Sequence, residues 1–306
     1  MPSPGLILAL ISAPFGPGAA PAPVAAESIL VSPQWLQARM KRSDLVILEI
    51  GEKPLYDAAH IPGAQFISLR AVSAPRQEGA LALELPPIAQ LDSVLEAYGI
   101  SDNTDVVVYF GKDWVTPTTR VFLTLEYAGL RGHVTMLDGG LPAWQAAGNP
   151  VTTEVPTPRR GTFTLHPRTD VVVDAAWVSR RLHAPDVAII DARDSVFYLD
   201  IMNNEMPRGG HIPGAKNVPF GSLAVSEEDN RLKSLDQLRQ MFVAAGAEPG
   251  DTVVSYCHIG QQGTFVFFAA RLLGYQVRLY DGSFQDWSAR PDLPVEGERP
   301  RTAAPQ

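Results

Sequence analysis

The chain has 306 residues, of which 45% are hydrophobic and 19% are charged, and its formal net charge is −8. This composition is typical of a folded globular protein, and the length suffices for two domains of ordinary size. The acidic balance and the lack of a basic run exclude nucleic acid as an expected partner, because phosphate binding requires clustered lysine and arginine.

The first 27 residues are predicted to be an export signal or a disordered leader. A short apolar run, Leu6 to Ile11, precedes a segment rich in Pro, Ala and Gly, and the small residues before Glu27 suit a cleavage site. The lack of Lys or Arg near the start and the break at Pro14 argue against a signal, and the alternative is a disordered leader. On balance we expect an exported or periplasmic protein, or otherwise a cytoplasmic one. No other segment reaches the roughly 18 apolar residues of a membrane helix.

Strand and helix signals alternate through the first half of the chain. Apolar runs predict buried strands at Leu45 to Ile50, Val106 to Phe110 and Val134 to Leu137. Apolar periodicity predicts helices at Leu91 to Tyr98 and Thr118 to Ala128. Because prolines gather between Pro150 and Arg160, we assign residues 28–150 to a first domain and 151–165 to a linker.

The second half repeats this alternation. Strands are predicted at Val187 to Asp191, Thr252 to Tyr256 and Val277 to Tyr280. Ser234 is predicted to cap one helix, and a second helix is predicted from Gly263 to Leu273, with Gly274 at its end. We assign residues 166–298 to a second domain and 299–306 to a tail. Strands that alternate with helices predict the α/β class with a mostly parallel sheet in each domain.

The two halves are copies of one unit. His60-Ile61-Pro62-Gly63-Ala64 recurs as His211-Ile212-Pro213-Gly214-Ala215. Asp138-Gly139-Gly140 with Trp144 recurs as Asp281-Gly282-Ser283 with Trp287. Markers that recur in the same order predict a tandem repeat, and both tryptophans are predicted to pack in the cores of their domains. In this alignment Phe110 occupies the place of Cys257, so the first domain lacks a nucleophile and is predicted to be inactive.

Cys257 is the only cysteine, so the chain has neither an internal disulfide nor a Cys-rich zinc site, and Cys257 is either an inert buried residue or a reactive thiol. It ends a predicted central strand, and a loop from His258 to Gln262 leads into the helix that begins at Gly263. Ligands bind at this edge of parallel sheets. Backbone N–H groups of such a loop and of the helix N-terminus create positive potential that favours an anion. They therefore stabilise a thiolate or a persulfide.

The segment from Tyr256 to Thr264 resembles the active-site loop of rhodanese-type sulfurtransferases. The two repeated motifs of the second half resemble the amino-terminal and carboxyl-terminal signatures of that family. The resemblance covers about Ser28 to Glu298 and implies two rhodanese-like three-layer α/β/α domains in tandem, of which the second is catalytic.

The family resemblance also implies a reaction. A small-molecule donor gives its outer sulfur to Cys257, and an acceptor such as cyanide, a small thiol or a thiol-containing protein removes it. Thiosulfate is the expected donor and 3-mercaptopyruvate the alternative. The resemblance implies no metal and no organic cofactor.

The candidate substrate-binding residues lie in the loop after the cysteine and in the segment before the repeated motif: His258, Ile259, Gly260, Gln261, Gln262, Gly263, Arg193 and Arg208. Arg193 either holds an anionic donor or pairs with a carboxylate such as that of Asp191. Arg208 lies in an insert of the second copy and contacts an anion or solvent. His258 either adds positive potential and contacts the donor, or points to solvent. His211 is expected to support the fold, because the inactive copy keeps His60 in the same place.

Some positions depart from the best-known thiosulfate enzymes of the family. Those enzymes carry basic side chains just after the cysteine, where this chain has His258 and Ile259, and a further arginine where this chain has Phe197. The loop is also unlike the small Gly/Ser loop that is typical of the mercaptopyruvate enzymes. The identity of the donor is therefore left open between the two.

Three other functions use a cysteine in such a place. A phosphatase or arsenate reductase of the Cys-x5-Arg kind needs an arginine six residues after the cysteine, where this chain has Gly263. A Cys–His hydrolase needs a histidine near the thiol and a group that orients it. A non-catalytic sulfur-carrier or binding module would keep the loop without turnover, as the first copy has already lost its nucleophile.

Overall fold

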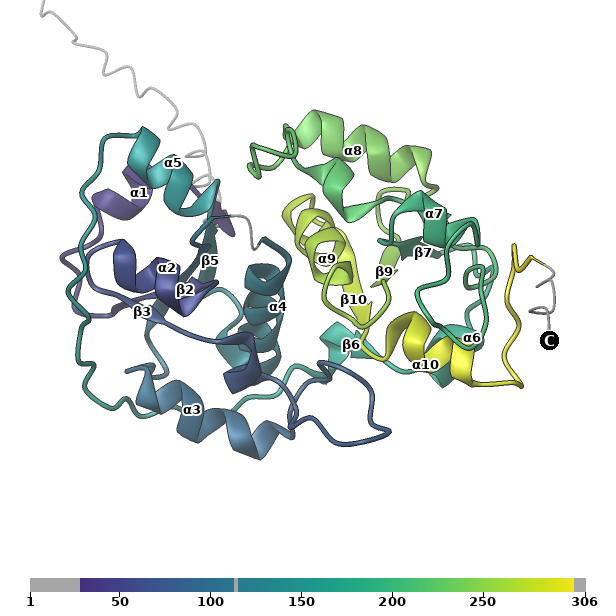
Figure 1. Cartoon of the computed structure of the whole chain (residues 1–306), viewed down its shortest axis with the longest axis horizontal. Coiled ribbons are helices and arrows are strands. Elements are labelled where there is room, and N and C mark those ends of the chain that lie inside the picture. Colours follow the sequence, from purple (N-terminus) through teal and green to yellow (C-terminus); the bar gives the residue numbers. More distant parts are fainter. Residues whose placement is uncertain (1–27, 113–114, 300–306) are drawn as a thin grey trace, which may run out of the picture.

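The computed structural model describes residues 28–112 and 115–299, so the candidate export segment lies outside the described residues. These residues form two domains, each built on a five-stranded parallel sheet (Figure 1). The strand order is β1-β5-β4-β2-β3 in the first domain and β6-β10-β9-β7-β8 in the second, which is one topology used twice. The prediction of two tandem α/β domains is confirmed.

The first domain contains strands β1 (Leu30–Val31), β2 (Leu45–Ile50), β3 (Ala64–Phe66), β4 (Asp105–Phe110) and β5 (Val134–Leu137). Its helices are α1 (Pro33–Gln37), α2 (Lys53–Ala58), α3 (Leu91–Ala97), α4 (Val115–Leu125) and α5 (Gly140–Ala146). Short helical segments are η1 (Leu69–Val72), η2 (Ile88–Gln90) and η3 (Glu126–Leu130).

The second domain contains strands β6 (Val172–Val173), β7 (Val187–Asp191), β8 (Lys216–Asn217), β9 (Thr252–Tyr256) and β10 (Gln276–Tyr280). Its helices are α6 (Ala175–Ser179), α7 (Ser195–Tyr198), α8 (Leu235–Ala244), α9 (Gly263–Leu272) and α10 (Ser283–Ala289). Short helical segments are η4 (Thr169–Val171) and η5 (Phe220–Leu223). In the described ranges, no helix is both long and apolar enough to cross a membrane.

The central strands are those with continuous apolar runs. In β4 every residue after Asp105 is buried, and in β9 every residue after Thr252 is buried. A strand covered by helices on both faces needs such a run, because neither face meets water. Trp144 and Trp287 are both fully buried, as their repeated positions predicted. The sequence signals therefore found the strands that form the centre of each sheet.

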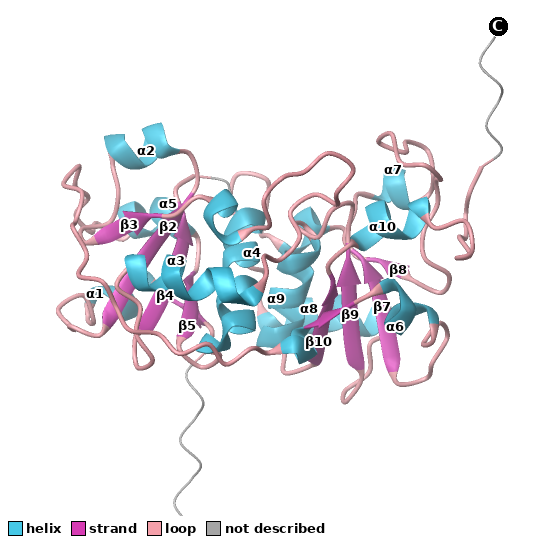
Figure 2. Cartoon of the chain, turned by 90° about the horizontal axis from the view of Figure 1, so that it is seen from below, coloured by secondary structure: helices cyan, strands magenta, loops and turns pink. Residues whose placement is uncertain are grey.

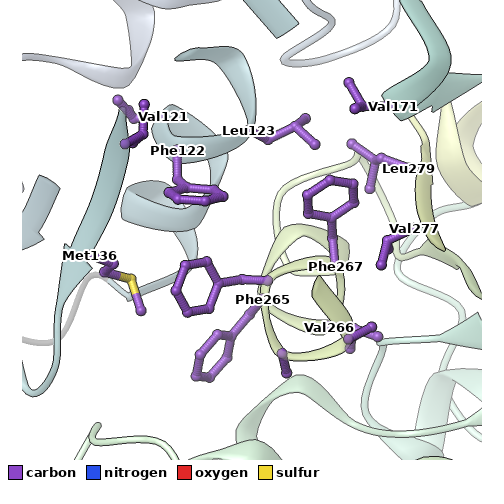
Figure 3. Packing of buried hydrophobic residues seen from close by; sticks show 14 of the residues in the cluster. Val121, Phe122, Leu123, Met136, Val171, Phe265, Val266, Phe267, Val277 and Leu279 are labelled. Carbon is purple, nitrogen blue, oxygen red and sulfur yellow. The ribbon is translucent and has the colours of Figure 1, made fainter. Parts of the chain in front are cut away.

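The two domains share one hydrophobic core across their boundary. Helices α4 and α9 lie side by side between the two sheets (Figure 2). The Oγ1 atoms of Thr119 and Thr264 are 2.8 Å apart, and the ring of Phe122 meets that of Phe268 edge-on with centroids 4.8 Å apart. Side chains of both helices join one cluster, in which Phe122 and Phe265 are seen with Met136 (Figure 3). This packing places the end of α4 beside the loop that precedes α9.

The segment that the sequence assigned to a linker packs along the first domain. Thr152 and His60 exchange backbone hydrogen bonds, and the N–H of Gly161 donates to the carbonyl of Glu96 at 2.8 Å. The chain then enters the second domain at η4. The assigned linker is therefore held against the first domain before the chain enters the second.

Candidate active site

Cys257 follows β9, the central strand of the second sheet, and its side chain is 1% exposed. Strand β9 lies between β7, which ends at Asp191, and β10, which ends at Tyr280. Because parallel strands end at the same edge of a sheet, the segments that follow these strands meet around the sulfur. The prediction that Cys257 lies at the carboxyl edge of a central strand is confirmed.

The loop after Cys257 is anchored by the turn that precedes α10. The N–H of Cys257 donates to Oγ of Ser283 at 3.2 Å, and its carbonyl accepts from the N–H of Phe284 at 2.9 Å. The carbonyl of His258 accepts from the N–H of Gln285, also at 2.9 Å. The repeated Asp-Gly-Ser motif therefore fixes the base of the loop. The sequence singled out this motif, but it did not predict the role of Ser283.

Gly260 forms the tight bend of the loop. Its φ is +78°, in the left-handed region that other residues rarely adopt, and a Cβ at this position would lie 2.6 Å from the carbonyl oxygen of Asp281. A side chain at Gly260 would therefore both strain the backbone and push the loop away from β10. The conformation of the loop therefore requires a glycine at this position.

The backbone N–H groups of the loop are free to bind an anion. Those of Thr264 and Phe265 donate to the carbonyls of Gln261 and Gln262. Within the described part of the chain, none of the N–H groups of residues 258–263 donates to a protein acceptor. Six successive N–H groups without an acceptor in the described chain, followed by the N-terminus of a ten-residue helix, give positive potential next to Cys257.

Arg193 is a buried brace. Its Nη2 atom donates to Oδ2 of Asp191 at 2.6 Å and to the carbonyl of Gly210 at 2.8 Å, and its guanidinium lies 4.1 Å over the ring of Phe284. Although burial alone would lower the pKa of Arg193, Asp191 raises it above its ordinary value, so Arg193 stays charged. Of the two roles expected from the sequence, this geometry favours the pair with a carboxylate over a contact with the donor.

Arg208 also differs from its expected role as an anion contact. Its guanidinium donates to four backbone carbonyls at the end of α10 and beyond it, at distances of 2.7–3.1 Å: those of Trp287, Ser288, Arg290 and Leu293. A cation at a helix C-terminus satisfies carbonyls that have no partner within the helix. Arg208 therefore holds the carboxyl-terminal end of the second domain together and is not part of the site.

His258 is 8% exposed and meets the ring of Phe197 edge-on, with centroids 4.6 Å apart. Burial, and secondly the charge of Arg193, lower the pKa of His258 to about 4. The imidazole is therefore neutral at pH 7, which corrects the expectations that it points to solvent or adds positive potential. Its Nε2 atom and Oε1 of Gln262 are both buried, and a hydrogen bond with Gln262 partly offsets the lowering of the pKa of His258.

The burial of His258 predicts a pH-dependent stability. His258 takes up a proton near pH 6.5 in the unfolded chain but only near pH 4 in the folded protein. The unfolded state thus binds more protons between these values, so the free energy of unfolding falls as the pH is lowered across this window. Between pH 6.5 and pH 4, we expect the free energy of unfolding of the wild type to fall, relative to that of a His258→Asn variant, by on the order of 2 kcal/mol.

Urea unfolding at a series of pH values measures this difference. The same substitution at an exposed histidine, His166→Asn, is the matched control for the change of side chain. A titration of His258 followed by NMR with a midpoint near pH 6.5 would contradict the expectation.

His211 packs as its counterpart in the first domain does. Its ring stacks on Tyr198 with centroids 3.8 Å apart, and its Nδ1 atom lies 2.9 Å from the carbonyl oxygen of the same residue. His60 stacks on Tyr56 at 3.9 Å, with Nδ1 2.7 Å from that carbonyl. The same contacts occur in both domains, so they support the fold of each domain.

The first domain has the same strand positions around the corresponding place, but it lacks the cysteine. Tyr109 and Glu49 occupy the positions of Tyr256 and Asp191, and Phe110 stands where Cys257 would be. Gly51 replaces Arg193, so Glu49 has no arginine partner among the described residues, and burial raises the pKa of Glu49 to about 7. The prediction that this domain cannot form a persulfide at that position agrees with the structure.

Helix α4 of the first domain contacts the loop of the second. Nε2 of Gln261 donates to Oγ1 of Thr116 at 3.1 Å, and the fully buried Arg120 donates from Nη1 to the carbonyl of Gly260 at 3.3 Å. Sequence reasoning did not identify Thr116 or Arg120. The available signal was a single arginine in a helix that has no other charged residue. In the described ranges, no group of three or more His, Cys, Asp or Glu side chains could hold a metal ion.

Comparisons with known proteins agree with this geometry. A family model described as "Rhodanese-like domain" matches residues 32–147 and 174–290. A Pseudomonas aeruginosa protein named "Probable 3-mercaptopyruvate sulfurtransferase" is 35% identical over 278 residues, which cover 87% of this chain and 97% of that protein. The thiosulfate sulfurtransferase of Azotobacter vinelandii is 30% identical over 271 residues, which cover 88% and 97%. The crystal structure of YnjE, 27% identical, matches 87% of this chain and 67% of its own with a TM-score of 0.74.

Proposed function

The chain belongs to the rhodanese family of sulfurtransferases, and from this premise we propose that Cys257 carries the transferred sulfur as a persulfide. The observation that supports this role most strongly is the run of unpaired N–H groups at residues 258–263, next to the only cysteine of the chain. Such a site stabilises the negative charge of a thiolate before the transfer and of a persulfide after it. A nucleophile activated in this way needs no general base.

The reaction proceeds in two displacements. The Cys257 thiolate attacks the outer sulfur of the donor, a new S–S bond forms, and the bond that held that sulfur in the donor breaks. With thiosulfate, sulfite leaves with the electron pair of the broken S–S bond. Cyanide or an acceptor thiolate then attacks the outer sulfur of the persulfide, and the Cys257 thiolate leaves. Thiocyanate or a new persulfide is released, and the protein returns to its starting state.

Thiosulfate is the donor that we propose first. An anion suits a site built from backbone N–H groups, and the Azotobacter vinelandii relative is named for this substrate. A second candidate, 3-mercaptopyruvate, is favoured by one specific observation. Arg193 is paired with Asp191, Arg120 is paired with Asp281, and His258 is neutral, so the described site offers a dianion no unpaired side-chain cation. A donor with a single negative charge needs less compensation.

Intact-mass spectrometry with each donor tests this proposal. We expect the protein to gain one sulfur atom from thiosulfate and to lose it to cyanide, with release of an equal amount of thiocyanate. Loading by 3-mercaptopyruvate alone would keep the persulfide mechanism and overturn the choice of donor. A folded protein with a free thiol that gains no sulfur from either donor or from a polysulfide would contradict the proposed function. It would favour a binding module instead.

A further inference from the structure

We propose that Arg120 of the first domain is a positioning residue for sulfur transfer, because it holds the loop of Cys257 in its binding conformation by the carbonyl of Gly260. The inference rests on the proposed function of Cys257. It gives the first domain, which lacks a nucleophile, a defined part in the reaction. Arg120 does not contact the sulfur in this account, and its effect passes through the backbone of the loop.

The contacts of Arg120 tie three segments together at one buried point. The side chain is 0% exposed, and its Nη1 atom donates both to the Gly260 carbonyl at 3.3 Å and to Oδ1 of Asp281 at 2.5 Å. Its Nη2 atom donates to the carbonyl of Leu83. The other oxygen of Asp281 accepts from the N–H of Leu85 at 2.9 Å. The arginine thus joins α4, the segment around Leu83 and the turn before α10 to the loop.

The Gly260 carbonyl is a sensitive point at which to hold the loop. The peptide unit is planar and trans, so the N–H of Gln261 points opposite to the carbonyl of Gly260. Because Arg120 draws the carbonyl toward α4, the N–H of Gln261 is turned away from α4. This N–H is one of the groups without a protein acceptor. A rotation of this single peptide unit would remove a donor from the anion site.

Glycine makes such a rotation easy. Gly260 has access to more backbone conformations than any other residue, so its observed φ of +78° must be held by contacts. The contacts of the loop base, at Ser283, Phe284 and Gln285, reach only residues 257 and 258. On the far side, Thr116 accepts from the side chain of Gln261, and Arg120 is the side chain that donates to the backbone carbonyl of Gly260.

The comparison between the two halves shows that this contact is one-sided. Thr119 and Thr264 bond to each other where α4 and α9 meet, and the residue that follows is Arg120 in one helix and Phe265 in the other. Other contacts between the domains are reciprocal. The N–H of Leu85 donates to Asp281, and in the other direction the N–H of Leu232 donates to Asp138 at 3.2 Å. Of the two helices, only that of the first domain has an arginine at this place, and its Nη1 atom donates to the domain that contains the cysteine.

The test compares Arg120→Met with the double variant Arg120→Met, Asp281→Asn. The single variant leaves Asp281 without its cation and could unfold, whereas the double variant removes that charge as well. Two readouts are needed: the pH profile of thiolate ultraviolet absorbance, which in this single-cysteine chain reports Cys257, and the rate of loading by thiosulfate. The matched control is Arg271→Met, which removes another arginine at the contact between the domains. Nε of Arg271 lies 3.6 Å from Oε1 of Glu126, and Arg271 is about 12 Å along α9 from Gly263, where that helix begins.

We expect the folded double variant to load sulfur roughly 100- to 1,000-fold more slowly, by analogy with the loss of one donor from an oxyanion site. Its thiolate profile should shift to higher pH, while that of Arg271→Met stays at the wild-type position. A folded double variant with the wild-type profile and loading rate would overturn the inference. The thiolate profile needs no sulfur donor, so this outcome is distinct from a wild type that fails to form a persulfide, which would overturn the proposed function.

Discussion

Replacing Cys257 with serine will reduce sulfur transfer to background, a loss on the order of a millionfold if the thiol behaves as other catalytic nucleophiles do. A hydroxyl is not ionised in this site at neutral pH, so Cys257→Ser offers no nucleophile and no leaving group. The fold should be unaffected, because the contacts of residue 257 with Ser283 and Phe284 are made by its backbone. Steady-state release of thiocyanate measures the first expectation, and thermal unfolding measures the second.

The control for this variant is a substitution in strand β9, two residues before Cys257. Ser255→Ala changes a fully buried residue of β9 whose hydroxyl has no hydrogen-bond partner in the described chain. We expect that variant to keep near-normal turnover. Turnover of Cys257→Ser above the uncatalysed rate would mean that sulfur travels by another route, and it would remove the basis of the mechanism.

Replacing Arg193 with methionine will cost about 3–5 kcal/mol of the free energy of unfolding. Asp191 is fully buried, and this change leaves its carboxylate without its cation. The cost of an unpaired buried charge is large because the protein interior solvates it poorly. The change should also loosen the Gly210 carbonyl, which accepts from Arg193 at 2.8 Å. Urea unfolding gives the free energy directly.

A surface ion pair of the same kind is the matched control. Arg168 and Asp170 are also two residues apart and 2.6 Å from each other, but their side chains are 30% and 53% exposed. We expect Arg168→Met to cost less than about 1 kcal/mol, since exposed pairs contribute little. Equal costs for the two variants would show that burial of the Arg193 pair has no energetic consequence. The double variant Arg193→Met, Asp191→Asn should recover part of the loss.

The centre of the fold could be predicted from the sequence because its signals are local. The apolar runs at Leu45–Ile50 and Val187–Asp191 coincide with strands β2 and β7. Ser234 caps α8, where it forms a capping box with Gln237. Strands β1 and β6 at the sheet edges have two residues each, which is too short for a periodic pattern. Such strands are defined by their neighbours in the sheet and not by their own residues.

The candidate site divides in the same way. The place of Cys257 follows from the strand before it and the helix after it, and both are readable in the sequence. The acceptors of Arg208 lie about 80 residues further along the chain, and two acceptors of Arg120, Gly260 and Asp281, lie in the other domain. These contacts depend on how the domains pack, which no local pattern encodes. An arginine in an anion-transferring protein therefore suggested a substrate contact where the fold uses it as a brace.

Mass spectrometry of the peptide that contains Cys257 tests the central claim most directly. The protein is loaded with thiosulfate, its persulfide is trapped with an alkylating reagent, and the peptide is sequenced in the spectrometer. The account predicts one additional sulfur atom between Cys257 and the alkyl group, which is absent when cyanide is added before the alkylation. A protein that produces thiocyanate while its Cys257 peptide carries no additional sulfur would contradict it.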